Sequence, residues 1–282
     1  MRIIESALEM QQTALVLRAQ GERIGFVPTM GNLHAGHLSL IRIARQQAGT
    51  AVVSIFVNPT QFGPNEDYAA YPRTFAADRA ACERAGVDLV FHPAVTEMYP
   101  EGASVSVTEN ALSRTLCGAS RPGHFDGVCT IVAKLFHLIQ PHVAVFGEKD
   151  AQQLRIIRRM VRDLRMPVEI VAGPTVREPD GLALSSRNQY LDADQRRQAA
   201  CLHLALEECR RRFAAGMRDP RELAAAMRAL IARHPAARPD YIEIVDNETL
   251  APLTGPIVRP ALAALAVRVG APRLIDNTVL TP

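Results

Sequence analysis

The chain has 282 residues and a formal net charge of +3, and 48% of its residues are hydrophobic while 22% are charged. This length allows one large domain or two, and the composition is ordinary for a soluble globular protein. The small, scattered excess of Lys and Arg does not favour a nucleic-acid-binding protein, but it is compatible with a small anionic substrate.

The N-terminus has no apolar core of the kind found in signal peptides, and no run of about 18 apolar residues suggests a membrane span. We therefore expect a cytoplasmic protein. The five cysteines form no CxxC pair, which favours reduced, structural thiols. They are Cys82, Cys117, Cys129, Cys201 and Cys209.

The first 175 residues alternate short apolar runs with segments of helical periodicity. The predicted strands are 24–27, 51–57, 87–91, 142–146 and 168–171. The predicted helices are 7–19, 38–48, 74–85, 128–139 and 151–163. This alternation is typical of a Rossmann-like, doubly wound α/β domain with a parallel sheet. Ligands of such a domain are expected beyond the carboxyl ends of the strands.

The pattern changes after residue 175, where two helices are followed by three strands. The predicted helices are 193–216 and 221–233, and the predicted strands are 241–245, 262–269 and 273–280. Consecutive helices and then consecutive strands indicate a smaller α+β domain. We therefore expect two domains, 1–175 and 176–282.

The segment from Pro28 to His37 links the predicted strand 24–27 to the next predicted helix. The N-terminus of a helix in this position binds anions through its free N–H groups and its dipole. His34 and His37 share a helical face, and an imidazole can donate to a phosphate oxygen. Capping or surface histidines are the plainer alternative. A metal site is a third, although no nearby Cys or carboxylate completes one.

The segment Gly147-Glu148-Lys149-Asp150 also lies between a predicted strand and a predicted helix. Lys149 could neutralise a phosphate there, or it could be an ordinary solvated side chain. Asp150 is well placed to cap the following helix.

Two glutamines follow predicted strands, Gln61 after 51–57 and Gln153 just after Lys149. Each side chain offers a donor and an acceptor for a hydroxyl or carboxylate group, but an isolated Gln is more often solvated. The polar connection 113–127 is either a substrate loop or a surface excursion.

Ser185, Ser186 and Arg187 stand in succession and could clamp an anion, or they could cap a helix. The chain has no P-loop motif and no nucleophile elbow. With the histidines, Lys149 and the two glutamines, the pattern favours adenylyl transfer, in which a carboxylate attacks the α-phosphate of ATP. Positioning and charge stabilisation would drive the reaction, with Mg²⁺ neutralising the phosphates.

Five motifs occur in a fixed order between Gly25 and Asn188. They are PTMGxLHxGH at 28–37, FVNPxQF at 56–62, RPGHFDGV at 121–128, FGEKDxQQ at 146–153 and SSRN at 185–188. In these motifs the chain closely resembles the pantothenate synthetase (pantoate–β-alanine ligase) family of the HxGH nucleotidylyltransferase superfamily.

The resemblance implies a Rossmann-like ATP- and pantoate-binding domain, a smaller C-terminal lid domain and a homodimer. The implied reaction joins (R)-pantoate to β-alanine through pantoyl adenylate, and it yields pantothenate, AMP and pyrophosphate. The implied catalytic residues are His34, His37, Lys149, Ser185, Ser186 and Arg187. The implied ATP-binding residues are Met30, His37, Gly147, Lys149, Asp150, Val176, Ser185, Ser186 and Arg187.

By the same resemblance, Gln61 and Gln153 bind pantoate and Asp78 lies near Mg²⁺. The family often has consecutive acidic residues before the position of Asp78, where this chain has Phe75-Ala76-Ala77, and a Met where it has Leu184. One alternative is another HxGH adenylyltransferase with a phosphorylated acceptor, for which further cations would replace the two glutamines. A nucleotide-binding protein without turnover is the other.

Overall fold

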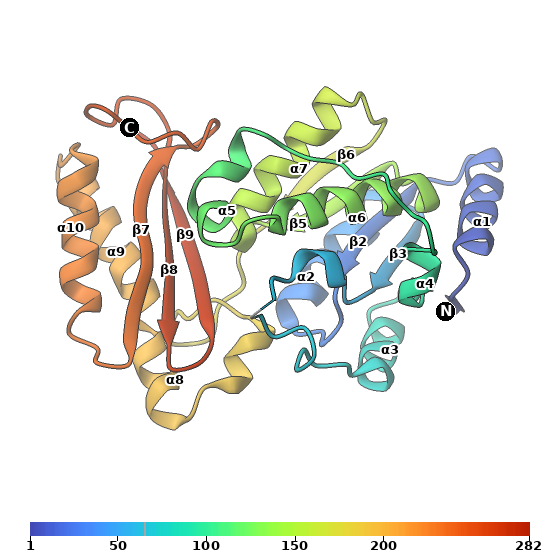
Figure 1. The fold of residues 1–282 in the computed structure, drawn as a ribbon, viewed down its shortest axis with the longest axis horizontal. Coiled ribbons are helices and arrows are strands. Elements are labelled where there is room, and N and C mark those ends of the chain that lie inside the picture. Colours follow the sequence, from blue (N-terminus) through green and yellow to red (C-terminus); the bar gives the residue numbers. More distant parts are fainter. Residues whose placement is uncertain (65) are drawn as a thin grey trace. The chain divides into compact units, whose positions relative to one another are not determined.

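The computed structural model describes residues 1–64 and 66–282 (Figure 1). The chain forms two compact units, which we call the N-terminal unit and the C-terminal unit. The N-terminal unit comprises Met1–Glu109, Arg121–Glu148 and Gln153–Pro174. The C-terminal unit comprises Asn110–Ser120, Lys149–Gln152 and Thr175–Pro282.

The N-terminal unit is built on a six-stranded sheet in the order β1-β4-β3-β2-β5-β6. Its strands are β1 (Arg2–Ile4), β2 (Ile24–Thr29), β3 (Thr50–Ile55), β4 (Leu89–Phe91), β5 (Val143–Gly147) and β6 (Glu169–Gly173). All neighbouring strands pair in parallel. This arrangement confirms the predicted Rossmann-like α/β class.

Helices and short 3₁₀ turns connect these strands. The helices are α1 (Ala7–Ala19), α2 (Ala35–Gln47), α3 (Phe75–Arg84), α4 (Val95–Met98), α6 (His124–Ile139) and α7 (Ala151–Asp163). The 3₁₀ turn η1 (Pro59–Gln61) follows β3, and η3 (Glu148–Asp150) follows β5. The chain leaves β2 toward β3 on one side and reaches β5 on the other, so the strand order reverses between β2 and β5.

Alternating side chains of the central strands pack against different helices. Val27 and Val53 join the core formed with Leu40 of α2. Phe26 and Phe146 instead meet Phe136 of α6, each with ring centroids 6.4 Å apart. Because successive strand residues point to opposite faces, α2 and α6 cover opposite faces of the sheet. Such double coverage explains why the strands are almost continuously apolar.

The C-terminal unit contains a three-stranded antiparallel sheet in the order β7-β8-β9. Its strands are β7 (Ala237–Asp246), β8 (Ala261–Val269) and β9 (Arg273–Leu280). Its helices and turns are η2 (Leu112–Arg114), α5 (Leu116–Ser120), η4 (Ser186–Tyr190), α8 (Ala193–Ala199), α9 (Cys201–Ala214) and α10 (Pro220–Ile231). Helix α10 packs on β7 and helix α9 packs on β8 and β9, around one apolar core (Figure 1).

The structure corrects several predicted boundaries. The helix predicted at 128–139 begins at His124, and the connection 113–127 contains α5. The helix predicted at 193–216 is two helices that meet at Ala200. The three-residue strand β1 and helix α4 were not predicted. The five cysteines are free and buried, in agreement with the predicted reduced thiols. Across the described ranges, the helices are too short or too polar to cross a bilayer.

Candidate active site

The loop between β2 and α2 takes its shape from Thr29 and Gly31. The Thr29 hydroxyl donates to the Ser54 carbonyl at 2.7 Å and accepts from the Gly31 N–H at 3.2 Å. Gly31 has a φ of +81°, which glycine adopts without the steric cost that a side chain would add. The chain thus turns sharply at the carboxyl end of β2 and enters α2.

The buried carboxylate of Asp78 holds the next residues of this loop from α3. It accepts hydrogen bonds from the Asn32 N–H at 2.9 Å and from the Leu33 N–H at 2.7 Å. The Thr74 hydroxyl donates to it at 3.1 Å. Only 2% of Asp78 is exposed. Both of its oxygens are therefore engaged in shaping the loop.

These contacts bear on the expectation that Asp78 lies near Mg²⁺. A carboxylate whose two oxygens already accept protein hydrogen bonds is poorly suited to serve as a metal ligand. Residues 1–64 and 66–282 hold no group of three or more His, Cys, Asp or Glu that could bind a metal ion. The residues described here thus do not build a protein cage for Mg²⁺.

His34 and His37 form a reciprocal cap at the start of α2. The Nδ1 atom of His34 accepts from the Gly36 N–H at 3.2 Å, and Nδ1 of His37 accepts from the His34 N–H at 3.3 Å. Their ring centroids are 4.1 Å apart. A neutral imidazole whose Nδ1 accepts must carry its proton on Nε2. The capping geometry therefore makes Nε2–H of each ring a donor, which is the form that suits a phosphate oxygen.

Gln61 ends the turn η1 beyond β3, and its amide is oriented from both sides. Asn58 donates from Nδ2 to Oε1 of Gln61 at 3.1 Å, and Nε2 of Gln61 donates to the Met30 sulfur at 3.3 Å. Asn58 is itself 1% exposed and receives a hydrogen bond from the Tyr99 hydroxyl at 2.8 Å. The same Asn58 Nδ2 donates to the Gly127 carbonyl of α6 at 3.1 Å.

Gly127 allows this close approach of α6 to η1. A Cβ atom at Gly127 would lie 2.4 Å from the Thr60 carbonyl oxygen, so only glycine fits there. The first turn of α6 therefore packs directly against the backbone of η1. Elsewhere in the N-terminal unit, Gly147 is the last residue of β5 and the half-buried Gln153 lies in the first turn of α7.

Lys149 belongs to the C-terminal unit, where its backbone is anchored by β9. The Asn277 side chain donates from Nδ2 to the Lys149 carbonyl at 3.0 Å. The Lys149 ammonium lies 3.8 Å from the Asp150 carboxylate, and 21% of the Lys149 side chain is exposed. Lys149 is thus a partly buried cation within η3, with its neighbour Asp150 as an ionic partner.

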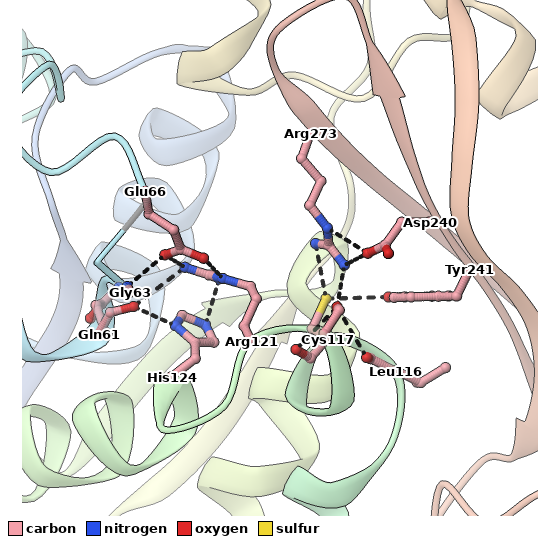
Figure 2. A network of polar contacts seen from close by, with 11 residues as sticks. Gln61, Gly63, Glu66, Leu116, Cys117, Arg121, His124, Asp240, Tyr241 and Arg273 are labelled. Atoms are coloured by element: carbon pink, nitrogen blue, oxygen red, sulfur yellow. Dashed lines mark hydrogen bonds and ion pairs between the residues drawn. The ribbon is translucent and has the colours of Figure 1, made fainter.

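Gln152 fastens the same segment to α5. Its amide donates to the Leu112 and Thr115 carbonyls at 2.8 Å each, and its oxygen accepts from the Cys117 N–H at 2.9 Å. The Cys117 sulfur in turn lies 3.3 Å from the Tyr241 hydroxyl and 3.4 Å from an Arg273 nitrogen (Figure 2). Burial raises the pKa of the Tyr241 hydroxyl, which therefore stays protonated.

The segment 176–188 is also organised locally within the C-terminal unit. Val176 accepts a backbone hydrogen bond from Leu184 at 3.0 Å. Ser185 caps η4 by accepting from the Arg187 N–H at 3.3 Å. Ser186 and Arg187 lie in η4 and are half-buried.

Within the N-terminal unit, the structure brings Met30 and Gln61 into contact and places His34 and His37 ring against ring. Within the C-terminal unit, it pairs Lys149 with Asp150 and Ser185 with Arg187. Sequence reasoning missed the buried and half-buried groups that orient these residues. They are Asn58, Tyr99, Arg121, His124, Gln152 and Asn277. The family motifs quoted above contain four of them: Asn58, Arg121, His124 and Gln152. Their place in these motifs was the signal in the sequence that could have identified them.

The sequence model of the family described as pantoate-beta-alanine ligase matches residues 2–279. The chain belongs to the pantoate–β-alanine ligase family. It is 55% identical over 280 residues to the pantothenate synthetase of Thermotoga neapolitana, covering 99% of this chain and 100% of that one. Membership of this family makes the chain a ligase.

Two solved structures from the ligase family support the same assignment. A pantothenate synthetase from Thermus thermophilus superimposes with a TM-score of 0.95 at 49% identity, over 100% of both chains. The ligase of Francisella tularensis, solved with beta-gamma ATP and beta-alanine, has a TM-score of 0.81 at 34% identity, over 99% of this chain and 97% of that one.

Proposed function

We propose that the chain condenses (R)-pantoate with β-alanine in two steps at the expense of ATP. In the first step a carboxylate oxygen of pantoate attacks the α-phosphorus, and the bond to the bridging oxygen breaks to release pyrophosphate. In the second step the β-alanine amine attacks the acyl carbon of pantoyl adenylate. The acyl C–O bond breaks, AMP leaves with that oxygen, and the amine proton passes to solvent.

The observation that supports this proposal best is the pair of Nε2–H donors at the carboxyl end of β2. His34 and His37 present them beside the N-terminus of α2, where the helix dipole adds positive potential. Such fixed donors stabilise charge that develops on the phosphates without having to reorganise. In the same proposal Lys149, Ser185, Ser186 and Arg187 also bind the phosphates.

The remaining contacts are assigned on the family resemblance. The backbone at Met30, Gly147, Asp150 and Val176 is proposed to run along the nucleotide. Gln61 and Gln153 would bind the hydroxyl and carboxylate groups of pantoate. The side chains that contact the Gln61 amide, Asn58 and Met30, are uncharged, which suits that acceptor better than a phosphorylated one. We also propose, from the same resemblance, a cytoplasmic homodimer and a lid role for residues 176–282.

Mg²⁺ is proposed to accompany ATP as its phosphate complex. It would neutralise phosphate charge, with phosphate oxygens and water as its ligands. The residues described above supply no dedicated metal cage.

An oxygen-labelling experiment tests the two-step reaction. The protein is mixed with MgATP, β-alanine and pantoate carrying ¹⁸O in its carboxylate, and the products are weighed by mass spectrometry. We expect pantothenate and AMP in equal amounts, with one ¹⁸O transferred to AMP. Label in inorganic phosphate, together with ADP, would instead mean γ-phosphoryl transfer and would overturn the site assignment.

Leaving out β-alanine separates the two steps. A single turnover without it should release one pyrophosphate per active site and leave pantoyl adenylate on the protein. Bound ATP without any turnover would indicate a nucleotide-binding protein. Turnover with a phosphorylated acceptor instead of pantoate would indicate another adenylyltransferase of the superfamily.

A further inference from the structure

Three partly buried side chains, which we call the Glu66 triad, surround the backbone of the Gln61–Gly63 turn (Figure 2). They are Glu66, Arg121 and His124. Arg121 donates to both carboxylate oxygens of Glu66 at 2.6 Å, one bond from Nε and one from Nη2. This two-pronged geometry is the strong form of an Arg–carboxylate pair.

The environment keeps Glu66 ionised. Burial alone raises the pKa of its carboxyl, but the hydrogen bonds and positive charge of Arg121 outweigh it and lower the pKa to about 2. The same carboxylate accepts from the Gly63 N–H at 3.2 Å. The ion pair is therefore attached directly to the backbone two residues beyond Gln61.

The hydrogen-bond pattern fixes the tautomer of His124. Arg121 Nη1 lies 2.9 Å from His124 Nε2, and a guanidinium can only donate, so Nε2 is the acceptor. The proton of the neutral ring then lies on Nδ1, which donates to the Gln61 carbonyl at 2.8 Å. Arg121 Nη2 approaches the same carbonyl at 3.3 Å.

The triad therefore holds the Gln61 backbone, whereas Asn58 and Met30 hold the Gln61 amide. We propose that Glu66, Arg121 and His124 are positioning residues that set the place of the Gln61 amide for pantoate. Arg121 and His124 bond the Gln61 backbone carbonyl and Glu66 bonds the Gly63 N–H, so the three side chains act on the turn that carries the amide. This inference rests on the proposed function, in which Gln61 binds pantoate.

A specific kinetic pattern follows from this arrangement. Loosening the turn by a fraction of an ångström would spoil contacts to pantoate but leave the loop of His34 and His37 intact, because Asp78 and Thr29 hold that loop separately. Misplacement of a positioning group by about 1 Å can cost 10²-fold in rate. We therefore expect the KM for pantoate to rise about tenfold in His124→Leu, with the KM for ATP changed less than twofold.

A conservative variant, His124→Asn, and a matched control, His137→Leu, show whether the effect comes from the lost hydrogen bond to Gln61. In His124→Asn the amide nitrogen takes the place of Nδ1 and can still donate to the Gln61 carbonyl. The KM for pantoate should therefore lie close to the wild-type value, well below that of His124→Leu. His137→Leu is the control, because His137 lies on the same helix and its Nδ1 bonds the Ala133 carbonyl at 2.7 Å. That variant should match wild type for both substrates.

Glu66→Gln provides a second route if His124→Leu folds poorly. It keeps the side-chain volume but weakens the Arg121 pair, and a smaller rise in the pantoate KM is expected. Steady-state kinetics and pantoate titration calorimetry would be run on all four variants and on wild type. Equal increases for pantoate and ATP, or no recovery in His124→Asn, would overturn the positioning role.

Measurements on wild type separate failure of the Glu66 triad role from failure of the proposed reaction. If wild type turns over pantoate and His124→Leu binds pantoate with normal affinity, only the positioning role of the Glu66 triad is refuted. Wild type that binds ATP but never uses pantoate refutes the proposed function, and the triad proposal fails with it.

Discussion

Gly31 has a left-handed backbone conformation and close neighbours, and an added methyl group would be unfavourable on both counts. Its φ is +81°, and a Cβ atom there would lie 3.0 Å from an Asp78 oxygen and 3.2 Å from Ile55. We expect Gly31→Ala to lower the free energy of unfolding by roughly 2–4 kcal/mol, from left-handed backbone strain and overpacking together. It should also reduce kcat/KM for ATP. Urea unfolding and steady-state kinetics measure the two effects.

Gly21→Ala is the matched control for that substitution. Gly21 has a φ of +79°, and no atom lies within 4 Å of the position that a Cβ atom would take there. This variant should show only the backbone cost of roughly 1–2 kcal/mol, with unchanged kinetics. Equal destabilisation of the two variants would mean that the contact with Asp78 does not constrain the loop.

Asp78 invites a test of its own, because loop support and metal binding predict different results. Asp78→Asn replaces one acceptor oxygen by an amide, so the half-buried N–H of Asn32 or of Leu33 loses its acceptor. We expect a loss of about 1–3 kcal/mol in stability. The Mg²⁺ concentration that gives half-maximal rate at fixed ATP should change less than twofold.

Asp88→Asn is the control for Asp78→Asn, because it also removes a carboxylate that accepts a hydrogen bond from a backbone N–H. Asp88 accepts from the Ala51 N–H at 2.8 Å and from Arg45 at 2.6 Å, away from the β2–α2 loop. The Asp88→Asn variant should have a lower free energy of unfolding but the same kinetic constants and Mg²⁺ requirement as wild type. A tenfold higher Mg²⁺ requirement in Asp78→Asn, at unchanged stability, would make Asp78 a metal ligand after all.

Helix α2 illustrates how one element can serve stability and chemistry with the same side chain. His34 caps the helix through Nδ1, which leaves the ring proton on Nε2. In His34→Asn the cap should persist, since Asn is among the best N-cap residues, but the Nε2–H donor is lost. We expect kcat to fall about 10²-fold or more, with a melting temperature close to that of wild type.

His34→Ala should show both losses at once. It removes the cap as well as the donor, so about 1 kcal/mol of stability should disappear in addition to the activity. Thermal unfolding and adenylation kinetics on the two variants separate the roles. Full activity in His34→Asn would show that the imidazole serves only as a cap.

Helix α6 shows which parts of an element the sequence reveals. The apolar periodicity of 128–139 predicted its body, but Pro122, Gly123 and Gly127 favoured a loop before it. In the structure Gly123 does precede the helix, with a φ of +79°, whereas Gly127 lies inside it. Gly127 is glycine because Thr60 lies against it, not because the helix ends there. A requirement set by tertiary packing has no local signature.

The same limit applies to the candidate site as a whole. The spacing of His34 and His37 after a strand predicted a helix N-terminus with two imidazoles, because the relevant contacts lie within a few residues. The partners of Asp78 and Glu66 are 45 and 55 residues away in sequence. Periodicity cannot identify such pairs, so the sequence indicated that these residues matter without showing what they contact.

At the scale of the whole molecule, the Glu66–Arg121 pair links local structure to acid stability. The carboxyl has a pKa of about 2 in the folded protein against an ordinary value of 4.5. The unfolded chain therefore takes up a proton at a higher pH than the folded one. The pair's contribution is complete above about pH 4.5 and is lost as the pH falls toward 2. Its upper limit is about 3 kcal/mol.

Comparing wild type with Glu66→Gln isolates this contribution. Their difference in free energy of unfolding, measured by urea titration at each pH, should be largest at neutral pH and shrink below pH 4.5. Glu9→Gln is the control, since its pair with Arg2 is equally short at 2.6 Å but the two side chains are 46% and 56% exposed. Solvent screening should leave that pair nearly without effect. A difference for Glu66→Gln that stays constant from pH 7 to pH 3 would show that the Glu66 charge is not what stabilises the turn.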